Sequence, residues 1–462
     1  MALPDSAVQW VEQRCGGRVV DVEQQVRWRP HHFLKIERPE GTIEVLVRSE
    51  RQGLAAGSTF QQHFDIAHEA RVLKALQGQG IKVPEFLGFN DEHRFILMER
   101  VEGTNELKDA PDDETRERVM TEYIEQLAAL HRLDVDSMTL SGLKIPVTPE
   151  ERAFGGKFGY VEQDFAGWKQ YLKPEPLLEL GIWWLHANVP PGDRYVSFVQ
   201  GDTGPGQFMF ADGHLTALID WELSHIGDPM LDLGVIRMRN MLYPTGPLRK
   251  PIAHYEEISG RPIDWQALGF YTVVSMLLTP IGLSTIMQRP SAHIEPVFPG
   301  FGWNATLRRG LTDALAEAIG LDVEPPELPE APASEWPQLI DYLVEYLEVK
   351  CAPIETDEAG RFEISAATSI ALSVQLESRV GAALLDADLS DMAKVLGRRP
   401  DDRDDGYAKL AELVAAGPAE RLEELVWLFA RTERRREYLH KPMMIAQDSG
   451  DFERLAPRKA DR

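Results

Sequence analysis

Cysteine is scarce in this chain, which has only Cys15 and Cys351 among its 462 residues. Two thiols so far apart do not form the closely spaced set that is typical of a disulfide-stapled secreted protein, and they suit a reducing compartment. The N-terminal sequence MALPDSAVQWVEQ also lacks the apolar core of a signal peptide, because acidic and polar side chains interrupt it. We therefore expect a cytoplasmic protein.

Long uninterrupted apolar runs are missing as well. The longest, from Tyr271 to Met287, contains Pro280 and is short for a bilayer span. We expect this run to form a buried helix, and we expect no membrane partner.

Positive charge is in deficit, with 49 Lys and Arg residues against 74 Asp and Glu residues and a net charge of −25. Broad nucleic-acid binding depends on neutralising phosphates with Lys and Arg, so we expect no nucleic-acid partner. An acidic surface also repels anionic ligands, so any nucleotide site in this protein must be locally basic.

The length of the chain predicts several domains, because 462 residues are too many for one hydrophobic core. The stretch LDVEPPELPEAPASEWP, from Leu321 to Pro337, is rich in proline and glutamate and is typical of a semi-rigid linker. We predict a small lobe, a larger lobe, a linker and a helical C-terminal domain. Their predicted bounds are 1–98, 99–322, 323–337 and 338–462.

The most informative segment begins at Gln200 and reads QGDTGPGQFMFADGHLTALIDWELSHIGDPMLDL. It places Asp202 in a loop, the amide of Gln207 five residues later, and Asp220 just after a predicted β-hairpin. Phosphoryl transfer needs such a set, because one carboxylate accepts the proton of an attacking hydroxyl while an amide and a second carboxylate hold Mg²⁺. Each residue taken alone has an ordinary structural explanation, so the prediction depends on the combination.

The hairpin predicts how the two expected metal ligands meet. Asp212-Gly213 is a strong signal for a tight turn between two short strands. Pairing about this turn places Gln207 near Leu218, one diagonal step from Asp220, so that both side chains can reach one metal ion. The predicted strands are Met209–Phe210 and Leu215–Ile219.

The segment resembles the aminoglycoside phosphotransferase and choline kinase superfamily. The pattern of that family is roughly H-G-D-x-x-x-x-N, then I-D-W/F-E, then G-D-P-x-x-D-L, and this chain matches it in order and spacing. Gln200 stands where the family has His, and Gln207 where it has Asn. The resemblance implies an α+β, bilobal, protein-kinase-like fold with a small antiparallel-sheet lobe and a mainly helical large lobe. It also implies that Asp228 and Asp232 brace the catalytic loop.

The resemblance also assigns nucleotide contacts in the small lobe. Arg48 ends a predicted strand and takes the place of the strand lysine that touches the α- and β-phosphates, and Glu69, on a helix predicted from Phe64 to Leu76, is its partner. The backbone at Glu99 and Val101 would hydrogen-bond adenine. Without the downstream motifs, Arg48 and Glu69 would be interpreted as surface charges.

One departure from the family lies in the turn that covers the phosphates. The family usually has glycine there, because close approach of the backbone to phosphate needs a missing Cβ. The corresponding segment, Val26 to Phe33, reads VRWRPHHF and contains no glycine. Either basic side chains replace the backbone N–H donors, or the segment is a solvated turn.

The large lobe contains residues whose role the sequence leaves open. The helix Tyr123–His131 has the L-A-x-L-H ending of the family, and we expect His131 to be hydrogen-bonded in the core rather than to act as an acid or base. Several other residues belong either to the core or to the acceptor pocket: Trp183, Trp184, Met238, Met241 and Tyr243.

The C-terminal residues form periodic apolar faces that predict helices, one of them made by Ile340, Leu343, Val344 and Leu347. This part is similar to a small helical protein that acts with bacterial hydroxyacyl-CoA kinases, and related kinase domains are fused to some acyl-CoA dehydrogenases. Its arginines either suit an anionic CoA or lie on a solvated helix face. They are Arg398, Arg399, Arg434, Arg435 and Arg436.

The expected function is that of an ATP- and Mg²⁺-dependent kinase acting on a small-molecule hydroxyl. Asp202 would be the catalytic base, Gln207 and Asp220 would hold the metal, and Arg48 would neutralise phosphate while Glu69 fixes it. A hydroxyacyl-CoA is the first choice of substrate, with an aminoglycoside or amino-alcohol as the alternative. A catalytically inactive, nucleotide-binding pseudokinase is a further alternative, and homodimer formation stays open.

Overall fold

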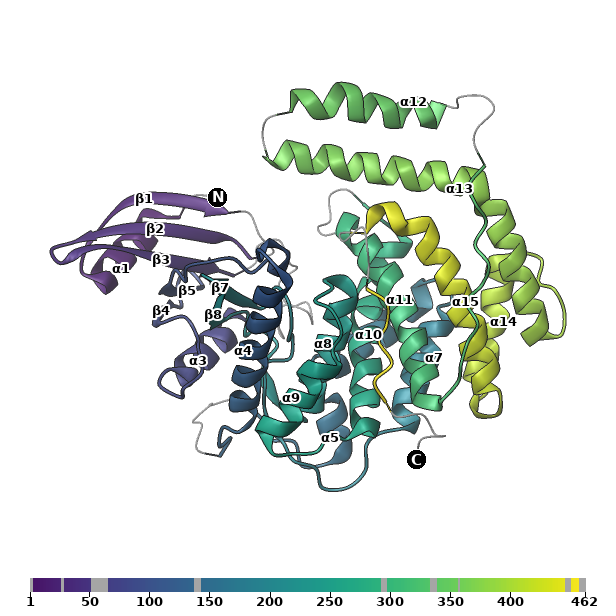
Figure 1. Ribbon diagram of the computed structural model, residues 1–462, viewed down its shortest axis with the longest axis horizontal. Coiled ribbons are helices and arrows are strands. Elements are labelled where there is room, and N and C mark those ends of the chain that lie inside the picture. Colours follow the sequence, from purple (N-terminus) through teal and green to yellow (C-terminus); the bar gives the residue numbers. More distant parts are fainter. Residues whose placement is uncertain are drawn as a thin grey trace. The chain divides into compact units, whose positions relative to one another are not determined.

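A computed structural model describes residues 3–25, 29–50, 65–136, 143–291, 297–332, 339–355, 358–444 and 450–456 (Figure 1). The chain forms two compact units, each assembled from separate stretches of sequence. Unit 1 contains Met1–Tyr160, Pro190–Ile236 and Thr245–Asp264, and unit 2 contains Val161–Val189, Arg237–Pro244 and Trp265–Arg462. The lobe, linker and tail boundaries expected from the sequence remain predictions.

Unit 1 begins with helix α1 (Asp5–Cys15) and contains a five-stranded antiparallel sheet with the strand order β1-β2-β3-β5-β4. Alternate side chains of β3 point to one face, so Val45 and Val47 are buried against Ala7 and Val11 of α1. The sheet therefore has its core on the α1 side. The strands are β1 (Arg18–Gln25), β2 (His31–Arg38), β3 (Gly41–Ser49), β4 (Phe86–Asn90) and β5 (Phe95–Glu99).

Helix α3 (Ile66–Leu76) carries the predicted apolar stripe and also Glu69. Asp65 caps the helix, since its side chain accepts a hydrogen bond from the Ala67 N–H at 3.0 Å. Ile66, Ala70, Leu73 and Leu76 are buried at helical spacing, as predicted, and Glu69 is buried with them. Residue 64, the predicted start, lies outside the described residues.

Two small two-stranded sheets lie around the segment that contains Asp202, Gln207 and Asp220. Strands β6 (Ser197–Val199) and β9 (His225–Gly227) pair with each other, and β7 (Phe208–Ala211) pairs with β8 (His214–Leu218). Asp212 and Gly213, between β7 and β8, have φ angles of 51° and 77°, which are the positive values that a tight two-residue hairpin turn needs. The predicted hairpin is confirmed.

The segment after β5 joins this hairpin through Thr104. Its N–H donates to the Phe210 carbonyl, and the Phe210 N–H donates to the Thr104 carbonyl, each at 3.0 Å. Gly103 has a φ of 110°, and a Cβ there would lie 2.1 Å from the Phe210 oxygen. Only glycine fits at this close approach of two backbones.

The helices of unit 1 lie around these strands. Helix α4 (Asp113–His131) packs against β6, β8 and α9 (Arg249–Ser259). The short elements η1 (Leu107–Asp109) and α5 (Pro149–Phe154) complete the unit. Two helices pass from one unit into the other, α6 (Lys157–Trp168) and α8 (Met230–Leu242).

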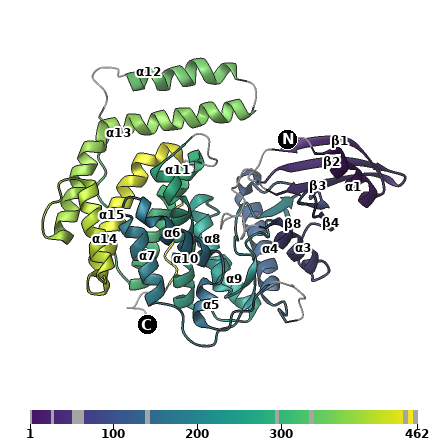
Figure 2. The same cartoon turned by 180° about the vertical axis from the view of Figure 1, so that it is seen from behind.

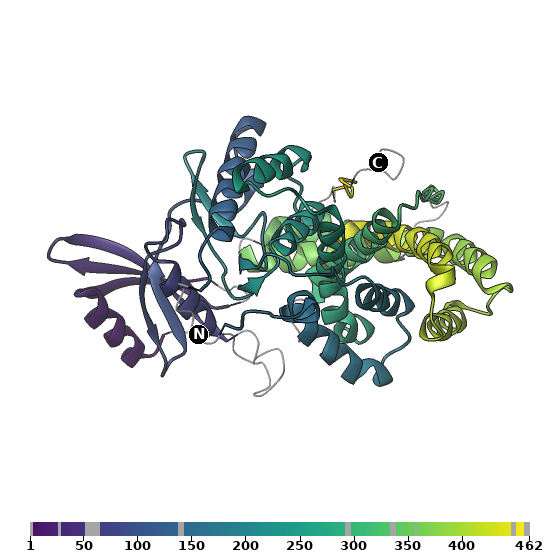
Figure 3. The ribbon, with the colours of Figure 1, turned by 90° about the horizontal axis from the view of Figure 1, so that it is seen from below.

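Unit 2 is helical throughout its described residues. Helix α10 (Trp265–Gln288) packs against α7 (Pro176–Ala187) and α11 (Val297–Ile319), and α11 packs against α15 (Leu422–His440) (Figures 1 and 2). Figure 3 shows the same helices from below. The others are α12 (Leu339–Tyr346), α13 (Glu358–Leu396), α14 (Arg403–Ala415), η2 (Lys169–Tyr171), η3 (Leu347–Cys351), η4 (Ala352–Ile354), η5 (Ala419–Arg421) and η6 (Lys441–Met443).

Helix α10 contains the longest apolar run of the sequence, including Pro280. By length and composition alone this helix could cross a membrane, but 61% of its most apolar window is buried inside the protein. A core helix of a soluble protein has the same properties, which agrees with the buried helix expected from the sequence.

The apolar face predicted in α12 is only partly buried. Val344 is buried, whereas 44% of Leu343 is exposed. The helix is fixed to α13 by polar contacts, because Asp341 accepts hydrogen bonds from Gln375 at 2.6 Å and from Arg379 at 2.8 Å. The periodicity predicted the helix correctly, and within the predicted apolar face Val344 is buried while Leu343 is exposed.

Candidate active site

The loop that contains Gln200 and Asp202 is held by a buried carboxylate. The N–H groups of Gln200 and Gly201 donate to the Asp232 carboxylate at 2.9 and 2.8 Å. Asp232 is fully buried and also contacts His131 Nε2 at 2.9 Å, while His131 Nδ1 lies 2.7 Å from the Tyr255 hydroxyl. Both predictions are confirmed, because Asp232 braces the loop and His131 is part of the core.

Asp228 plays a second bracing role. Its carboxylate accepts a hydrogen bond from the N–H of Met230, the first residue of α8, at 2.9 Å. It also forms an ion pair with Arg194 at 2.5 Å. Asp228 is 1% exposed. The G-D-P-x-x-D-L element therefore has the structural role that the sequence predicts.

Gln200, which replaces the family's histidine, is an anchor of the loop. Its side-chain amide donates to the Ile219 carbonyl at 2.8 Å and accepts from the Tyr123 hydroxyl at 3.1 Å. Gly201, next to it, has a φ of 81°, and a Cβ there would lie 2.4 Å from the Leu223 carbonyl oxygen. Gln200 therefore ties the loop to the end of β8 and to α4, as a hydrogen-bonding residue should.

Asp202 and Gln207 are in direct contact. The Gln207 Nε2 donates to the Asp202 Oδ2 at 2.6 Å, and Gln207 is 6% exposed. This bond fixes the rotation of the Asp202 carboxylate. It also assigns the Gln207 nitrogen to Asp202, so the amide oxygen is the atom with which Gln207 could hold a cation.

The register of the hairpin differs by one residue from the prediction. Phe208, rather than Gln207, lies opposite Leu218, because the pairing shifts between Met209 and Phe210. The extra residue of this β-bulge moves Gln207 along its partner strand. The Ile219 N–H donates to the Gln207 carbonyl at 3.0 Å, so Gln207 lies beside the residue that precedes Asp220.

Asp220 adopts a strained backbone conformation, with a φ of 63°. A residue with a Cβ pays for this left-handed geometry, and such outliers gather at functional sites. The carboxylate of Asp220 accepts a hydrogen bond from Arg48 Nη2 at 2.8 Å, and Arg48 Nε donates to Glu69 Oε2 at 3.0 Å. The predicted contact between Arg48 and Glu69 is confirmed, and the contact with Asp220 is an addition that sequence reasoning missed.

The charged groups of this cluster shift one another's pKa values. Burial disfavours the charge of Arg48, but the carboxylates of Glu69 and Asp220 outweigh it and hold the pKa of Arg48 above its ordinary value. Glu222 shows the opposite balance. Burial, followed by the nearby Asp220 carboxylate, raises the pKa of Glu222 to about 7, while Arg29 and Arg48 oppose this rise.

The expected adenine contacts fall at the end of β5. The Glu99 N–H donates to the Glu85 carbonyl at 3.0 Å. A hydrogen bond from Glu99 to adenine would therefore use its carbonyl. Val101 follows in the segment that leads to Gly103 and the hairpin.

The donor set around the hairpin fits a magnesium ion. The described residues contain no group of three or more His, Cys, Asp or Glu side chains that could hold a metal ion by themselves. Mg²⁺ does not need such a group, since one or two protein oxygens and the nucleotide phosphates usually complete its shell. The Asp220 carboxylate and the Gln207 amide oxygen are ligands of this kind. The backbone contact between Gln207 and Ile219 brings them to the same end of the hairpin.

A comparison with known families agrees with this geometry. Residues 56–271 match the model of the phosphotransferase enzyme family. These residues are similar to a phosphotransferase enzyme domain. The match includes Glu69, the catalytic loop and the hairpin, but it begins after Arg48. The prediction of a phosphotransferase is confirmed at this level.

Curated relatives of this chain are named as acyl-CoA dehydrogenases. The chain is 28% identical over 231 residues to acyl-CoA dehydrogenase family member 11 of Rattus norvegicus. The aligned residues cover 46% of this chain and 28% of that protein. The chain is 25% identical over 338 residues to the probable acyl-CoA dehydrogenase IBR3 of Arabidopsis thaliana, covering 62% of this chain and 39% of that protein. The matched part thus spans well under half of either relative.

A solved structure supports the fold of the phosphotransferase domain. A Ralstonia eutropha protein described as a candidate aminoglycoside phosphotransferase aligns with a TM-score of 0.51 and 23% identity, covering 66% of this chain and 96% of that one. The predicted kinase-like α+β fold, with its antiparallel-sheet lobe and helical remainder, is confirmed.

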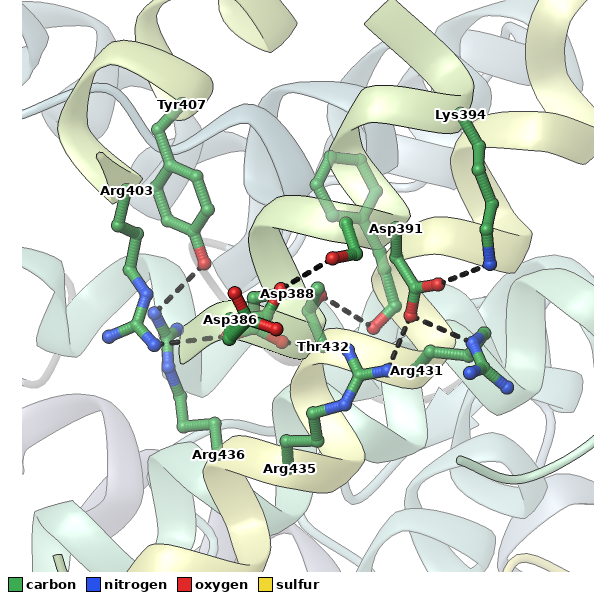
Figure 4. Close-up of polar contacts among 12 residues, drawn as sticks. Asp386, Asp388, Asp391, Lys394, Arg403, Tyr407, Arg431, Thr432, Arg435 and Arg436 are labelled. Atoms are coloured by element: carbon green, nitrogen blue, oxygen red, sulfur yellow. Dashed lines mark hydrogen bonds and ion pairs between the residues drawn. The ribbon is translucent and has the colours of Figure 1, made fainter. Parts of the chain in front are cut away.

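Four of the five arginines expected either to suit a CoA or to lie on a solvated helix face form ion pairs inside unit 2, namely Arg399, Arg434, Arg435 and Arg436. Arg435 is 3% exposed and donates to Asp388 at 2.8 Å as well as to Asp391, and Arg436 donates to the Tyr407 hydroxyl at 3.2 Å (Figure 4). Arg434 pairs with Asp313, and Arg399 with Asp386. Arg435 is therefore neither on a solvated face nor aimed at a ligand, and these contacts hold helices α11, α13, α14 and α15 together.

The undecided residues of the large lobe are now divided. Trp184, Met238 and Met241 are buried, and the Trp184 ring lies 6.4 Å from that of Phe270 in α10. These three belong to the core. Trp183 and Tyr243 are half-buried, so for them both interpretations, core residue and acceptor-pocket residue, stay open.

Proposed function

We propose that this protein is an ATP- and Mg²⁺-dependent kinase that phosphorylates the hydroxyl group of a small molecule. The observation that carries the proposal is the position of Arg48, which donates to both Glu69 and Asp220. It links the small sheet to the carboxylate expected to hold the metal. A nucleotide phosphate bound near Arg48 would thus lie close to the metal ligand.

Each residue of the proposed site has a separate role in the reaction. Asp202, oriented by Gln207, accepts the proton of the acceptor hydroxyl while the hydroxyl oxygen forms a bond to the γ-phosphorus and the bond to the β-phosphate oxygen breaks. Arg48 neutralises charge on the phosphates. A bound Mg²⁺, held by Asp220 and Gln207, would supply charge neutralisation between the β- and γ-phosphates.

For the acceptor, we propose a hydroxyacyl-CoA. The support is that curated relatives of this chain are named as acyl-CoA dehydrogenases. Four of the five tail arginines no longer contribute to this choice, because Arg399, Arg434, Arg435 and Arg436 pair with carboxylates within unit 2. An aminoglycoside or amino-alcohol is the alternative acceptor. A cytoplasmic location also remains a proposal, which rests on the cysteine content.

The test is ADP release across a panel of hydroxyacyl-CoAs, free hydroxy acids and amino-alcohols. On the best acceptor, Asp202→Asn should lower kcat on the order of 10²-fold or more, the usual scale for a general base, and leave the ATP Kd nearly unchanged. Asp113→Asn is the control, since that side chain is 95% exposed. Near-normal turnover by Asp202→Asn would contradict the catalytic role. ATP binding by the wild-type protein without turnover of any acceptor would favour the pseudokinase.

A further inference from the structure

The described part of the turn between β1 and β2 has few backbone donors to offer an anion. Its described part begins at Arg29, and the next residue is Pro30, which has no N–H group. The Pro30 carbonyl accepts a hydrogen bond from the Ser49 N–H at 3.0 Å, so the β2–β3 ladder continues up to the turn. A phosphate near this part of the turn would be met by side chains.

The Arg29 side chain turns inward from this position. Only 2% of it is exposed, and its Nε donates to Glu222 Oε2 at 2.8 Å. A buried ion pair loses the hydration of both charges and adds little net stability over an apolar contact. Stability alone is therefore a weak reason for an arginine at this position.

The partner of Arg29 belongs to the same short segment as the partner of Arg48. Asp220 accepts from Arg48 Nη2, and Glu222, two residues later, accepts from Arg29 Nε. The strands agree with this placement, because His31 lies opposite Arg48 in the β2–β3 ladder and its Nε2 is 3.2 Å from Arg48 Nη1. Two guanidinium groups thus flank residues 220–222.

The charge balance of the cluster means that an anion could bind there only with the help of both cations. Arg29 and Arg48 face three carboxylates, those of Glu69, Asp220 and Glu222. The chain as a whole carries a net charge of −25. A nucleotide brings several more negative charges, and it can bind an acidic protein only where cations are concentrated.

We propose that Arg29 binds the nucleotide phosphates together with Arg48, and that Glu222 positions its guanidinium group. The ligand class is nucleoside di- and triphosphates. The planar fork of the guanidinium forms charge-assisted hydrogen bonds with phosphate oxygens, and thereby replaces the backbone N–H groups of a glycine-rich turn. This inference rests on the proposed kinase function.

The experiment compares ligands with and without phosphates. Calorimetry on the full-length protein gives the Kd of adenosine, ADP and ATP, with EDTA present so that metal binding does not contribute. Arg29→Gln should raise the Kd of ADP and ATP about tenfold or more, the scale of a hydrogen bond to a charged group, and change that of adenosine by less than about twofold. Glu222→Gln should shift the same two ligands in the same direction, because it releases the guanidinium group. Arg116→Gln, which removes an ion pair with Asp113 in the same unit, should change none of them.

Each outcome decides the proposal. Equal losses for all three ligands would show a merely structural ion pair, and wild-type affinities in Arg29→Gln would overturn the proposal outright. If Arg29→Gln fails to fold, Arg29→Lys decides, because it keeps the charge but not the fork. It should weaken ADP and ATP but not adenosine, and an unchanged ADP Kd would contradict the proposal. A wild-type protein that binds no nucleotide overturns the kinase function as well, whereas normal turnover with an insensitive Arg29 overturns this inference alone.

Discussion

The guanidinium group of Arg48 lies 2.8 Å from the Asp220 carboxylate, and this contact joins β3 to the segment that follows β8. The two residues are 172 positions apart in the sequence. Asp220 therefore has two expected partners, Arg48 in this structure and a metal ion in the nucleotide complex. When a metal ion binds the Asp220 carboxylate, the Arg48 Nη2 would be released to contact phosphate, while the Arg48 Nε stays hydrogen-bonded to Glu69.

Asp220→Asn should abolish most of the magnesium-dependent turnover, by on the order of 10²-fold or more, because it removes the charged ligand. Asn tolerates the positive φ at this position, so the backbone is preserved. Asp212→Asn is a matched control, since Asp212 also has a positive φ and lies in the turn of the same hairpin. The measurement is ADP release against Mg²⁺ concentration. Turnover by Asp220→Asn that matches Asp212→Asn at every concentration would exclude Asp220 as a metal ligand.

Arg48→Lys should lower kcat/KM for ATP about tenfold or more. A lysine keeps the charge but cannot donate to Glu69 and Asp220 from a rigid planar fork. Arg94→Lys is the control, because Arg94, which immediately precedes β5 of the same sheet, pairs with three carboxylates, those of Glu50, Asp65 and Asp91, but is 34% exposed. Steady-state kinetics with varied ATP separate the two variants. A loss of equal size in both would mean that Arg48 has only a structural role.

Local signals in the sequence were sufficient to predict the hairpin and its turn. Asp212-Gly213 demanded positive φ angles, and the spacing of Asp202, Gln207 and Asp220 marked the loop. The register was missed by one residue, because the bulge opposite Met209 and Phe210 leaves no mark in a two-residue turn signal.

Contacts between distant segments were the part that could not be predicted from the sequence. The ion pair of Arg29 with Glu222 spans 193 positions, and either residue alone looks like a surface charge. The same holds for Arg435, which sequence reasoning placed on a solvated face or against a CoA. Its burial depends on Asp388 and Asp391 of another helix, and a carboxylate partner in three dimensions has no signature in the local sequence.

The close approach at Gly103 should make its replacement costly. Gly103→Ala should lower the free energy of unfolding by roughly 2–4 kcal/mol, because the new Cβ would lie 2.1 Å from the Phe210 oxygen in addition to the backbone strain. Gly80→Ala separates the two effects, since Gly80 also has a positive φ of 79° but no atom within 4 Å of the added Cβ. It should cost about 1–2 kcal/mol from strain alone. Urea unfolding measures both, and equal losses would mean that the backbone pairing of Thr104 with Phe210 relaxes without cost.

His440, the last residue of α15, should make the stability of the protein sensitive to acid. Burial, together with the nearby Arg436, lowers the pKa of His440 to about 4. The unfolded chain, with an ordinary histidine pKa near 6.5, then binds more protons than the folded one between pH 6.5 and 4. Stability is fully present above pH 6.5 and falls as the pH decreases through this window.

The expected loss from His440 between pH 6.5 and 5 is about 1.5 kcal/mol. His440→Gln removes the titrating group and should flatten the pH dependence by that amount. Lys441→Gln is the control, because it changes a neighbouring charge but removes no group that titrates in this range. The measurement is urea unfolding of the three proteins at several pH values between 5 and 7. Identical pH profiles for wild type and His440→Gln would show that His440 is hydrated in the folded protein and that its pKa is not depressed.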